Sequence, residues 1–231
     1  MARTPLFIAV ELQQVEEVHQ LLMAGVNVRE PSVFPNWTPL RMAVLGENPE
    51  IVDLLSRFGA NTTELTSWNA TFLHLIAYTH MGPEAGLDAV RERQLTDVAR
   101  RLIQHGVDVS VRDDRGFTAL QMAARNCHVA MVSVLLACPD LNPLDIGGPN
   151  GQTAEEMVAA LLVTRVATAL PEQTAHVDAT REILAMLRAE PERRTQERRA
   201  AFAMALIPRL GVASPVKALD PELVRMVLET P

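Results

Sequence analysis

A short apolar opening returns five times along the chain at nearly constant spacing. Its five copies are TPLFIAV from Thr4, TPLRMAV from Thr38, TFLHLIA from Thr71, TALQMAA from Thr118 and TAEEMVA from Thr153. Successive threonines are 34, 33, 47 and 35 residues apart, so three intervals lie close to 33 and the third carries an insertion. A period of about 20–50 residues is typical of repeat proteins. The chain is therefore predicted to fold as a stack of similar units, each contacting its neighbours.

A second apolar segment follows each opening, and each unit is therefore predicted to be a pair of helices. In the second unit Thr38 can cap a short helix whose Leu40 and Ala43 face inward. Ile51 is one of several apolar residues that recur at helical spacing in the segment PEIVDLLSRFGAN. Gly59 can end that helix, because glycine adopts a left-handed conformation at low cost. One such pair cannot bury its apolar face alone, so stacking has to supply the core.

The pattern resembles the ankyrin repeat, whose units run from a turn through T-P-L-H-x-A-A and a G-H step to V-V-x-L-L and G-A. The resemblance covers roughly residues 4–190 and includes the terminal glycines Gly25, Gly59 and Gly106. It implies an all-α fold, an ankyrin-repeat solenoid of about five repeats with a C-terminal helical tail. We number the repeats one to five from the five threonines.

Two departures from the pattern bear on the domain organisation. The insertion in repeat three, about residues 78–95, is expected either to lengthen the second helix or to form a loop between the helices. Repeat five is degenerate, with a second helix expected from about Thr174 to Ala189. Pro191 then coincides with a change of charge and with the loss of the period, and proline disfavours helix continuation. The expected domains are therefore 1–190, the repeat array, and 191–231, the helical tail.

Composition excludes several function classes. The net charge of −7 argues against nucleic-acid binding by phosphate neutralisation, because that mode needs a basic face. No apolar run approaches the ~20 residues that span a bilayer, and the N-terminus lacks a secretory signal. Two cysteines fit a reducing compartment. We expect a cytoplasmic protein, or at least an intracellular one, without a membrane partner.

Catalytic and metal sites are not expected. The candidate constellation is Cys127 and His128 with His74, His80 and His105. Nucleophile and base must meet in space, whereas Cys127 and His128 fill the family's G-H step and His74 is the histidine of T-P-L-H. Paired ligands at zinc spacing are absent, and so are glycine-rich phosphate loops. The chain is predicted to be no enzyme and to need no cofactor.

The resemblance places a protein partner on the concave side of the array, where the turns between repeats project as fingers. Aromatic and arginine side chains dominate interface energetics, and this surface holds both tryptophans and the only tyrosine. The alternative is that Phe34, Trp37 and Trp68 pack the fingers on one another. The expected partner-binding residues on the concave face and fingers are Phe34, Trp37, Trp68, Tyr78, Asp114, Arg115, Phe117, Arg125 and Asn126.

The tail contains ALDPELVRMVLE, a segment with good helix-start signals at Asp220 and Pro221. It resembles the first helix of an F-box, and the layout is similar to a SOCS box; both imply a substrate-recognition adaptor of a cullin-type ubiquitin ligase. The alternatives are a cap on the last repeat and a helix for another partner. The apolar residues expected to bind an adaptor or to cap the array are Leu219, Pro221, Leu223, Val227 and Leu228.

Overall fold

The computed structural model describes residues 4–30, 37–66, 68–79, 89–168 and 174–206, and its regular structure in these ranges is helical. The prediction of an all-α array of helix pairs is confirmed. Two isolated antiparallel bridges, Arg112 with Thr118 and Gly147 with Gln152, lie in the turns between repeats. The first helices of the pairs are α1 (Pro5–Glu11), α3 (Pro39–Leu45), α5 (Phe72–Thr79), α7 (Ala119–Arg125) and α9 (Ala154–Thr168). The second helices are α2 (Val15–Met23), α4 (Pro49–Arg57), α6 (Ala89–Gln104), α8 (Val129–Leu136) and α10 (Thr174–Leu206).

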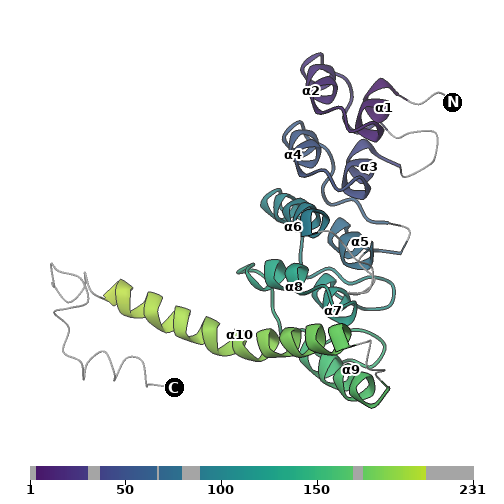
Figure 1. Ribbon diagram of the computed structural model, residues 1–231. Coiled ribbons are helices and arrows are strands. Elements are labelled where there is room, and N and C mark those ends of the chain that lie inside the picture. The colour runs from purple at the N-terminus through teal and green to yellow at the C-terminus, as the bar shows by residue number, and fades with distance from the viewer. Residues whose placement is uncertain (1–3, 31–36, 67, 80–88, 169–173, 207–231) are drawn as a thin grey trace. The chain divides into compact units, whose positions relative to one another are not determined.

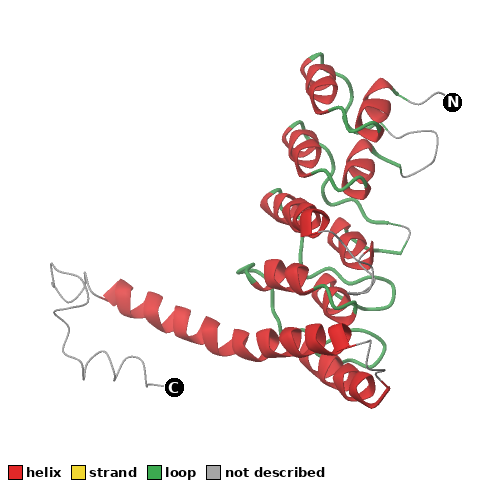
Figure 2. Ribbon diagram, in the orientation of Figure 1, coloured by secondary structure: helices red, strands yellow, loops and turns green. Residues whose placement is uncertain are grey.

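The helices of the array form two layers, which Figure 1 shows as two columns. One layer contains α1, α3, α5, α7 and α9, each packed against the next, and the other contains α2, α4, α6 and α8 in the same order. Figure 2 shows in green the short loops that connect α1 with α2, α3 with α4 and α7 with α8. Each repeat therefore contacts mainly its neighbours, as expected for a solenoid.

The threonines that open repeats one, two, four and five cap their first helices. The hydroxyl of Thr38 accepts a hydrogen bond from the backbone N–H of Arg41 at 3.2 Å, as predicted. Thr4 caps α1 in the same way, and Thr118 forms a reciprocal capping box with Gln121. A side-chain acceptor at this position satisfies a backbone donor that the helix itself leaves unpaired. The repeated threonine therefore sets where each unit begins.

The core between repeats contains most of the residues that the pattern predicted for repeat two; Leu54, predicted with them, is only half-buried. Leu40, Ala43, Ile51, Val52 and Leu55 of repeat two are all 0–1% exposed. A small residue at Ala43 lets neighbouring helices approach closely, while the branched residues of α4 fill the layer towards α2 and α6. The buried side chains thus follow the helical period of each unit rather than one central cluster.

Residues 89–95 of the insertion in repeat three lengthen the second helix, one of the two outcomes that the sequence left open. α6 has 16 residues, against nine in α2 and α4 and eight in α8. Its first turn carries Arg91, which forms an ion pair with Glu47 of repeat two. Residues 80–88 of the insertion lie outside the described residues.

The predicted helix end near Ala189 is wrong, whereas the predicted domain boundary between residues 190 and 191 stays a prediction. α10 runs from Thr174 to Leu206 with Pro191 inside it, so the second helix of repeat five does not end near Ala189. The buried carboxylate of Glu190 accepts hydrogen bonds from Arg193 and Arg194, one turn further on. Burial alone would raise the pKa of Glu190, but these two guanidinium groups outweigh it and hold the pKa below its ordinary value. This pairing joins the turns on either side of the proline and offsets the lost backbone hydrogen bond.

The chain divides into two compact units, Met1–Leu184 and Ala185–Pro231. The first unit contains the helices α1 to α9 and the start of α10. The second contains the remainder of α10 and residues 207–231, which lie outside the described residues together with all five predicted tail-binding positions. In the part of the chain that the structure describes, no helix is long and apolar enough to cross a membrane.

Candidate functional site

His74 links repeats three and four. Its Nδ1 accepts from the backbone N–H of Thr71 at 3.2 Å, so the hydrogen lies on Nε2, which donates to the carbonyl of Phe117 at 2.9 Å. Burial lowers the pKa of His74, although the Phe117 carbonyl and the negative charge of Asp113 partly counter it. The imidazole is therefore neutral at pH 7 and serves as a fixed connector between the two repeats.

Gln121 occupies the equivalent position between repeats four and five. Its amide oxygen accepts from the backbone N–H of Thr118 at 3.0 Å, and its amide nitrogen donates to the carbonyl of Gln152 at 2.8 Å. Phe117 and Gln152 each directly precede the threonine of their repeat. The two junctions are therefore built to one plan, and a pocket lies at each.

The pocket at the junction of repeats three and four, which we call the 3/4 pocket, has a volume of about 160 Å³. Trp68 and Tyr78 line it and are well exposed, at 66% and 47%. The rest of its lining consists of Ala70, His74, Leu75, Met122, Asp113, Asp114 and Arg115. It thus combines aromatic and apolar surface with three charged side chains from the turn of repeat four.

Hydrogen bonds between successive turns fix the backbone beside the 3/4 pocket. The N–H of Asp114 donates to the carbonyl of Trp68 at 3.0 Å, and Asn69 Nδ2 donates to Asp114 Oδ1 at 2.8 Å. Asp113 Oδ1 accepts from the backbone N–H groups of Arg115 and Phe117, which closes the turn. Asn69 itself has a φ of 52°, a left-handed conformation that asparagine tolerates. The pocket is therefore preorganised by backbone contacts.

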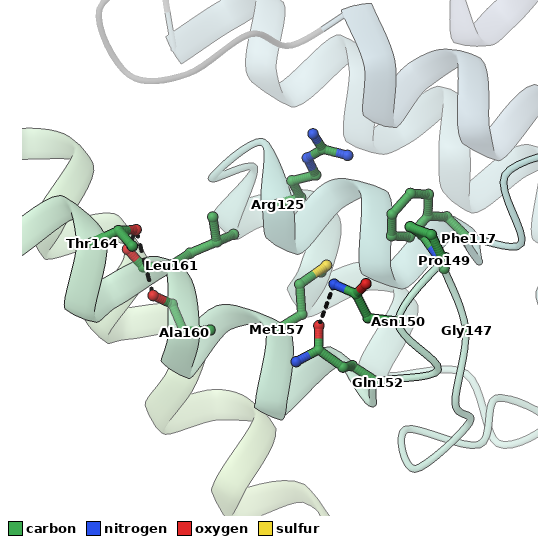
Figure 3. Close-up of a pocket in the computed structure, with 11 residues that line it drawn as sticks. Phe117, Arg125, Gly147, Pro149, Asn150, Gln152, Met157, Ala160, Leu161 and Thr164 are labelled. Carbon is green, nitrogen blue, oxygen red and sulfur yellow. Dashed lines mark hydrogen bonds between the residues drawn. The ribbon is translucent and has the colours of Figure 1, made fainter.

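The pocket at the next junction, the 4/5 pocket, is larger and differs in character (Figure 3). Its volume is about 330 Å³, and Met157 and Leu161 of α9 give it an apolar side. The guanidinium of Arg125 lies 5.6 Å from the ring centre of Phe117, a cation–π contact. Asn150 donates to the Gln152 side chain at 3.5 Å on the opposite side. The remaining lining residues are Gly147, Gly148, Pro149, Ala160 and Thr164.

The two pockets bring together six of the nine residues that the sequence proposed for the concave face and fingers. Four line the 3/4 pocket and two line the 4/5 pocket: Trp68, Tyr78, Asp114 and Arg115 in the first, Phe117 and Arg125 in the second. Trp37 is 36% exposed and lines neither, and Phe34 lies outside the described residues.

Two predicted site residues hold the array together. Phe117 was expected to face outward, but it is only 7% exposed because its ring packs at the junction below Arg125. Asn126 uses its side-chain amide to donate to the carbonyl of Ala77 at 2.8 Å, a bond between repeats three and four. Burial between turns thus occurs at Phe117, for which it was not predicted, while Trp68, one of the residues for which it was considered, remains largely exposed.

The turn before repeat five was not among the predicted fingers, although its residues line the 4/5 pocket. Aligning the chain on the repeated threonine could have found it. Gly151 precedes Thr153 by two residues, just as Gly116 precedes Thr118, and both have positive φ. Met122 and Met157 likewise share one position after the threonine. The degenerate appearance of repeat five hid this equivalence.

Cys127 lies in the step between α7 and α8, as the pattern predicted. It has a φ of 61°, is buried, and its thiol contacts the guanidinium of Arg165 and the hydroxyl of Thr180. The contact joins repeat four to α9 and the start of α10. Among the described residues, no group of three or more histidine, cysteine, aspartate or glutamate side chains could hold a metal ion.

Comparison with known proteins supports the repeat assignment. Residues 87–136, which include α6, the turn of repeat four, α7 and α8, match the family model for ankyrin repeats in many copies. The array is an ankyrin-repeat solenoid. Ankyrin repeats are in general non-catalytic modules that bind proteins.

Similar curated proteins share the ankyrin region. The B-cell lymphoma 3 protein homolog of mouse is 32% identical over 147 residues, which are 62% of this chain and 31% of that protein. A putative ankyrin repeat protein of fowlpox virus is 28% identical over 138 residues, 58% of this chain and 37% of that protein. The chain thus spans about a third of the length of these relatives.

A third relative is named as an enzyme. The phosphocholine transferase AnkX of Legionella pneumophila is 24% identical over 148 residues, which are 54% of this chain but 16% of that protein. The shared segment is a small part of that protein, and the transferase activity in its name belongs to that protein.

Proposed function

We propose that this ankyrin solenoid is a non-catalytic binding module that holds a protein partner over the 3/4 and 4/5 pockets. One observation carries the proposal: exposed aromatic and arginine side chains from successive repeats gather around two adjoining pockets. Such side chains supply most of the free energy in protein interfaces, above all where they meet a preformed hollow. The names of the relatives identify no specific partner for this chain.

The proposal is tested by affinity capture followed by mass spectrometry. The double variant Trp68→Ala and Tyr78→Ala removes two exposed aromatic side chains without disturbing the core. We expect it to lose a partner that the wild type retains, because aromatic anchors typically contribute about 2 kcal/mol or more each. Met23→Ala is the matched control, since Met23 is equally exposed but lies at the end of α2 in the other helix layer. Equal loss from both variants would contradict the proposal.

A finer form of the proposal gives the chain a second partner. The segment LDPELVRMVL suggests that the tail recruits a cullin-type ligase, which would make the chain a substrate-recognition adaptor. The competing role is a cap that only covers the last repeat. A chain ending after Leu206 keeps α10 whole and removes the segment. Loss of co-purifying cullin components with unchanged stability supports the adaptor, whereas lower stability without any ligase component in the wild type supports the cap.

A further inference from the structure

We propose that the 3/4 pocket binds a lysine or arginine side chain of the partner protein. The inference rests on the proposed function and specifies what the partner must present. It draws on the aromatic walls of the pocket, on the charges at its rim and on the contrast with the 4/5 pocket.

The walls of the 3/4 pocket suit a cation with a hydrocarbon stem. Trp68 and Tyr78 offer aromatic faces, which attract ammonium and guanidinium groups, and tryptophan is the best of the aromatic residues at this. Leu75, Ala70 and Met122 supply apolar surface against which the methylene groups of a long side chain can pack. The volume of about 160 Å³ is on the scale of one such side chain rather than a folded element.

The carboxylates favour a positive ligand. Asp113 and Asp114 line the pocket together with one guanidinium, that of Arg115. The Asp113 carboxylate closes its own turn through Oδ1, and the exposed Asp114 carboxylate uses Oδ1 to accept from Asn69. His74 at the same pocket is neutral at pH 7, because burial lowers its pKa. Two negative charges against one positive charge therefore leave the lining net negative.

The 4/5 pocket provides the contrast within the same molecule. Its charged lining residue is Arg125, whose guanidinium is exposed beside the Phe117 ring. The guanidinium would repel a cation there, and the described residues that line this pocket include neither aspartate nor glutamate. Of these two pockets, the 3/4 pocket is therefore the one that selects a basic side chain of the partner.

The test uses capped single residues as probes and the two tryptophan indole N–H signals as reporters in ¹H–¹⁵N NMR spectra. Nα-acetyl lysine methylamide and its arginine counterpart are titrated into the full chain at millimolar concentrations and constant ionic strength. We expect a saturable shift of the Trp68 indole signal and none of the Trp37 signal, because Trp37 lines neither pocket. The norleucine and glutamate analogues are expected to bind at least about fivefold more weakly, because they lack the charge that the carboxylates and aromatic faces attract.

Asp114→Asn is the decisive variant. The asparagine can still accept from Asn69, so the turn is retained while one negative charge is lost. We expect the lysine probe to bind it about three- to tenfold more weakly, whereas Asp140→Asn, an equal charge change at another exposed position, leaves binding unchanged. Equal binding of norleucine and lysine, or an unchanged affinity of Asp114→Asn, would overturn the inference. Loss of partner capture by the Trp68 and Tyr78 variant alongside such a result would leave the proposed function standing.

Discussion

The junction of repeats three and four and the junction of repeats four and five share the same hydrogen-bond pattern but differ in the side chains that line their pockets. At each junction one side chain, three residues after the threonine that opens the repeat, accepts a hydrogen bond from the backbone N–H of that threonine. The same side chain donates to the backbone carbonyl of the residue just before the threonine of the next repeat. At the first junction this side chain is His74, and at the second it is Gln121. Beside the first lies a small aromatic and acidic pocket, and beside the second a larger one with Arg125. The comparison separates what a repeat needs in order to stack from what it can vary in order to bind.

At these two junctions one side chain supplies both a donor and an acceptor, and its chemistry differs between them. An imidazole and a primary amide both supply the pair, so either satisfies two buried backbone groups. Only the imidazole titrates near neutral pH. The exposed side chains around the pockets do not take part in these hydrogen bonds between repeats, and their residue types differ most between the two junctions.

The largest effect is expected from filling the close contact between the two turns. A Cβ at Gly148 would lie 2.4 Å from the Phe117 ring, and Gly148 also has a φ of +70°. We expect Gly148→Ala to lower the free energy of unfolding by about 3 kcal/mol, because overpacking and left-handed strain add. Urea denaturation measures it. Gly151→Ala is the control: its φ is +58° but no atom lies within 4 Å, so about 1 kcal/mol is expected. Equal losses would show that the turns are not tightly packed.

Replacing the connecting side chain at either junction, His74 or Gln121, should lower the free energy of unfolding by somewhat less. His74→Leu leaves the Phe117 carbonyl and the Thr71 N–H without their partner in a buried place. We expect a loss of about 2–3 kcal/mol, and a similar loss for Gln121→Leu. His74→Gln copies the other junction and should lose less than about 1 kcal/mol. If His74→Gln were as damaging as His74→Leu, the two junctions would not share one plan.

Lowering the pH should destabilise the junction at His74 but not the junction at Gln121. The pKa of His74 is lowered in the folded state, mainly by burial, so folding disfavours the imidazolium. Stability is then complete above the unfolded pKa of about 6.5 and declines as the pH falls from there towards the folded pKa. Urea denaturation at pH 7.5 and 5.0 measures the decline for wild type and for His74→Gln, so that the other five histidines cancel. The same pH dependence in both proteins would refute the assignment to His74.

The smallest effect on stability is expected from Arg125→Ala. Its guanidinium is exposed over the Phe117 ring, a contact worth about 0.5–1 kcal/mol at such a site. Partner capture should nevertheless weaken, because Arg125 lines the 4/5 pocket. Arg100→Ala on α6, which removes an exposed arginine paired with Asp97, is the control that should leave capture unchanged. Loss of stability without loss of capture would make Arg125 a packing residue.

Much of the array could be predicted because each repeat obeys the same local rules. The capping threonine, the 3.6-residue apolar spacing and the terminal glycines act within a few residues, so they can be recognised without tertiary information. The same local reasoning gave a wrong prediction at Pro191. Proline removes one backbone hydrogen bond from a helix, but the ion pairs that Glu190 forms with Arg193 and Arg194 on the other side of the proline were not part of the prediction.

The candidate site was less predictable because it depends on contacts between repeats. The Phe117 side chain is buried because it packs against the turn of repeat five at Gly148. The residue spacing within repeat four contains no information about this contact with the next repeat. Trp68, Tyr78, Asp114 and Arg115 could be proposed from their positions in the repeat, but their convergence on one pocket follows from the backbone bond between Asp114 and Trp68. The apolar tail positions lie beyond the described residues and stay predictions.

Site-specific photo-cross-linking tests the central claim most directly. A photoreactive phenylalanine analogue replaces Tyr78 at the 3/4 pocket or, in a second protein, Val90 on α6, which is also well exposed but lies in the other helix layer. After irradiation in native lysate, the binding-module account predicts a discrete protein cross-link from position 78 that the Trp68→Ala change diminishes, and none from position 90. Cross-links of equal yield from both positions, or from position 90 alone, would contradict it.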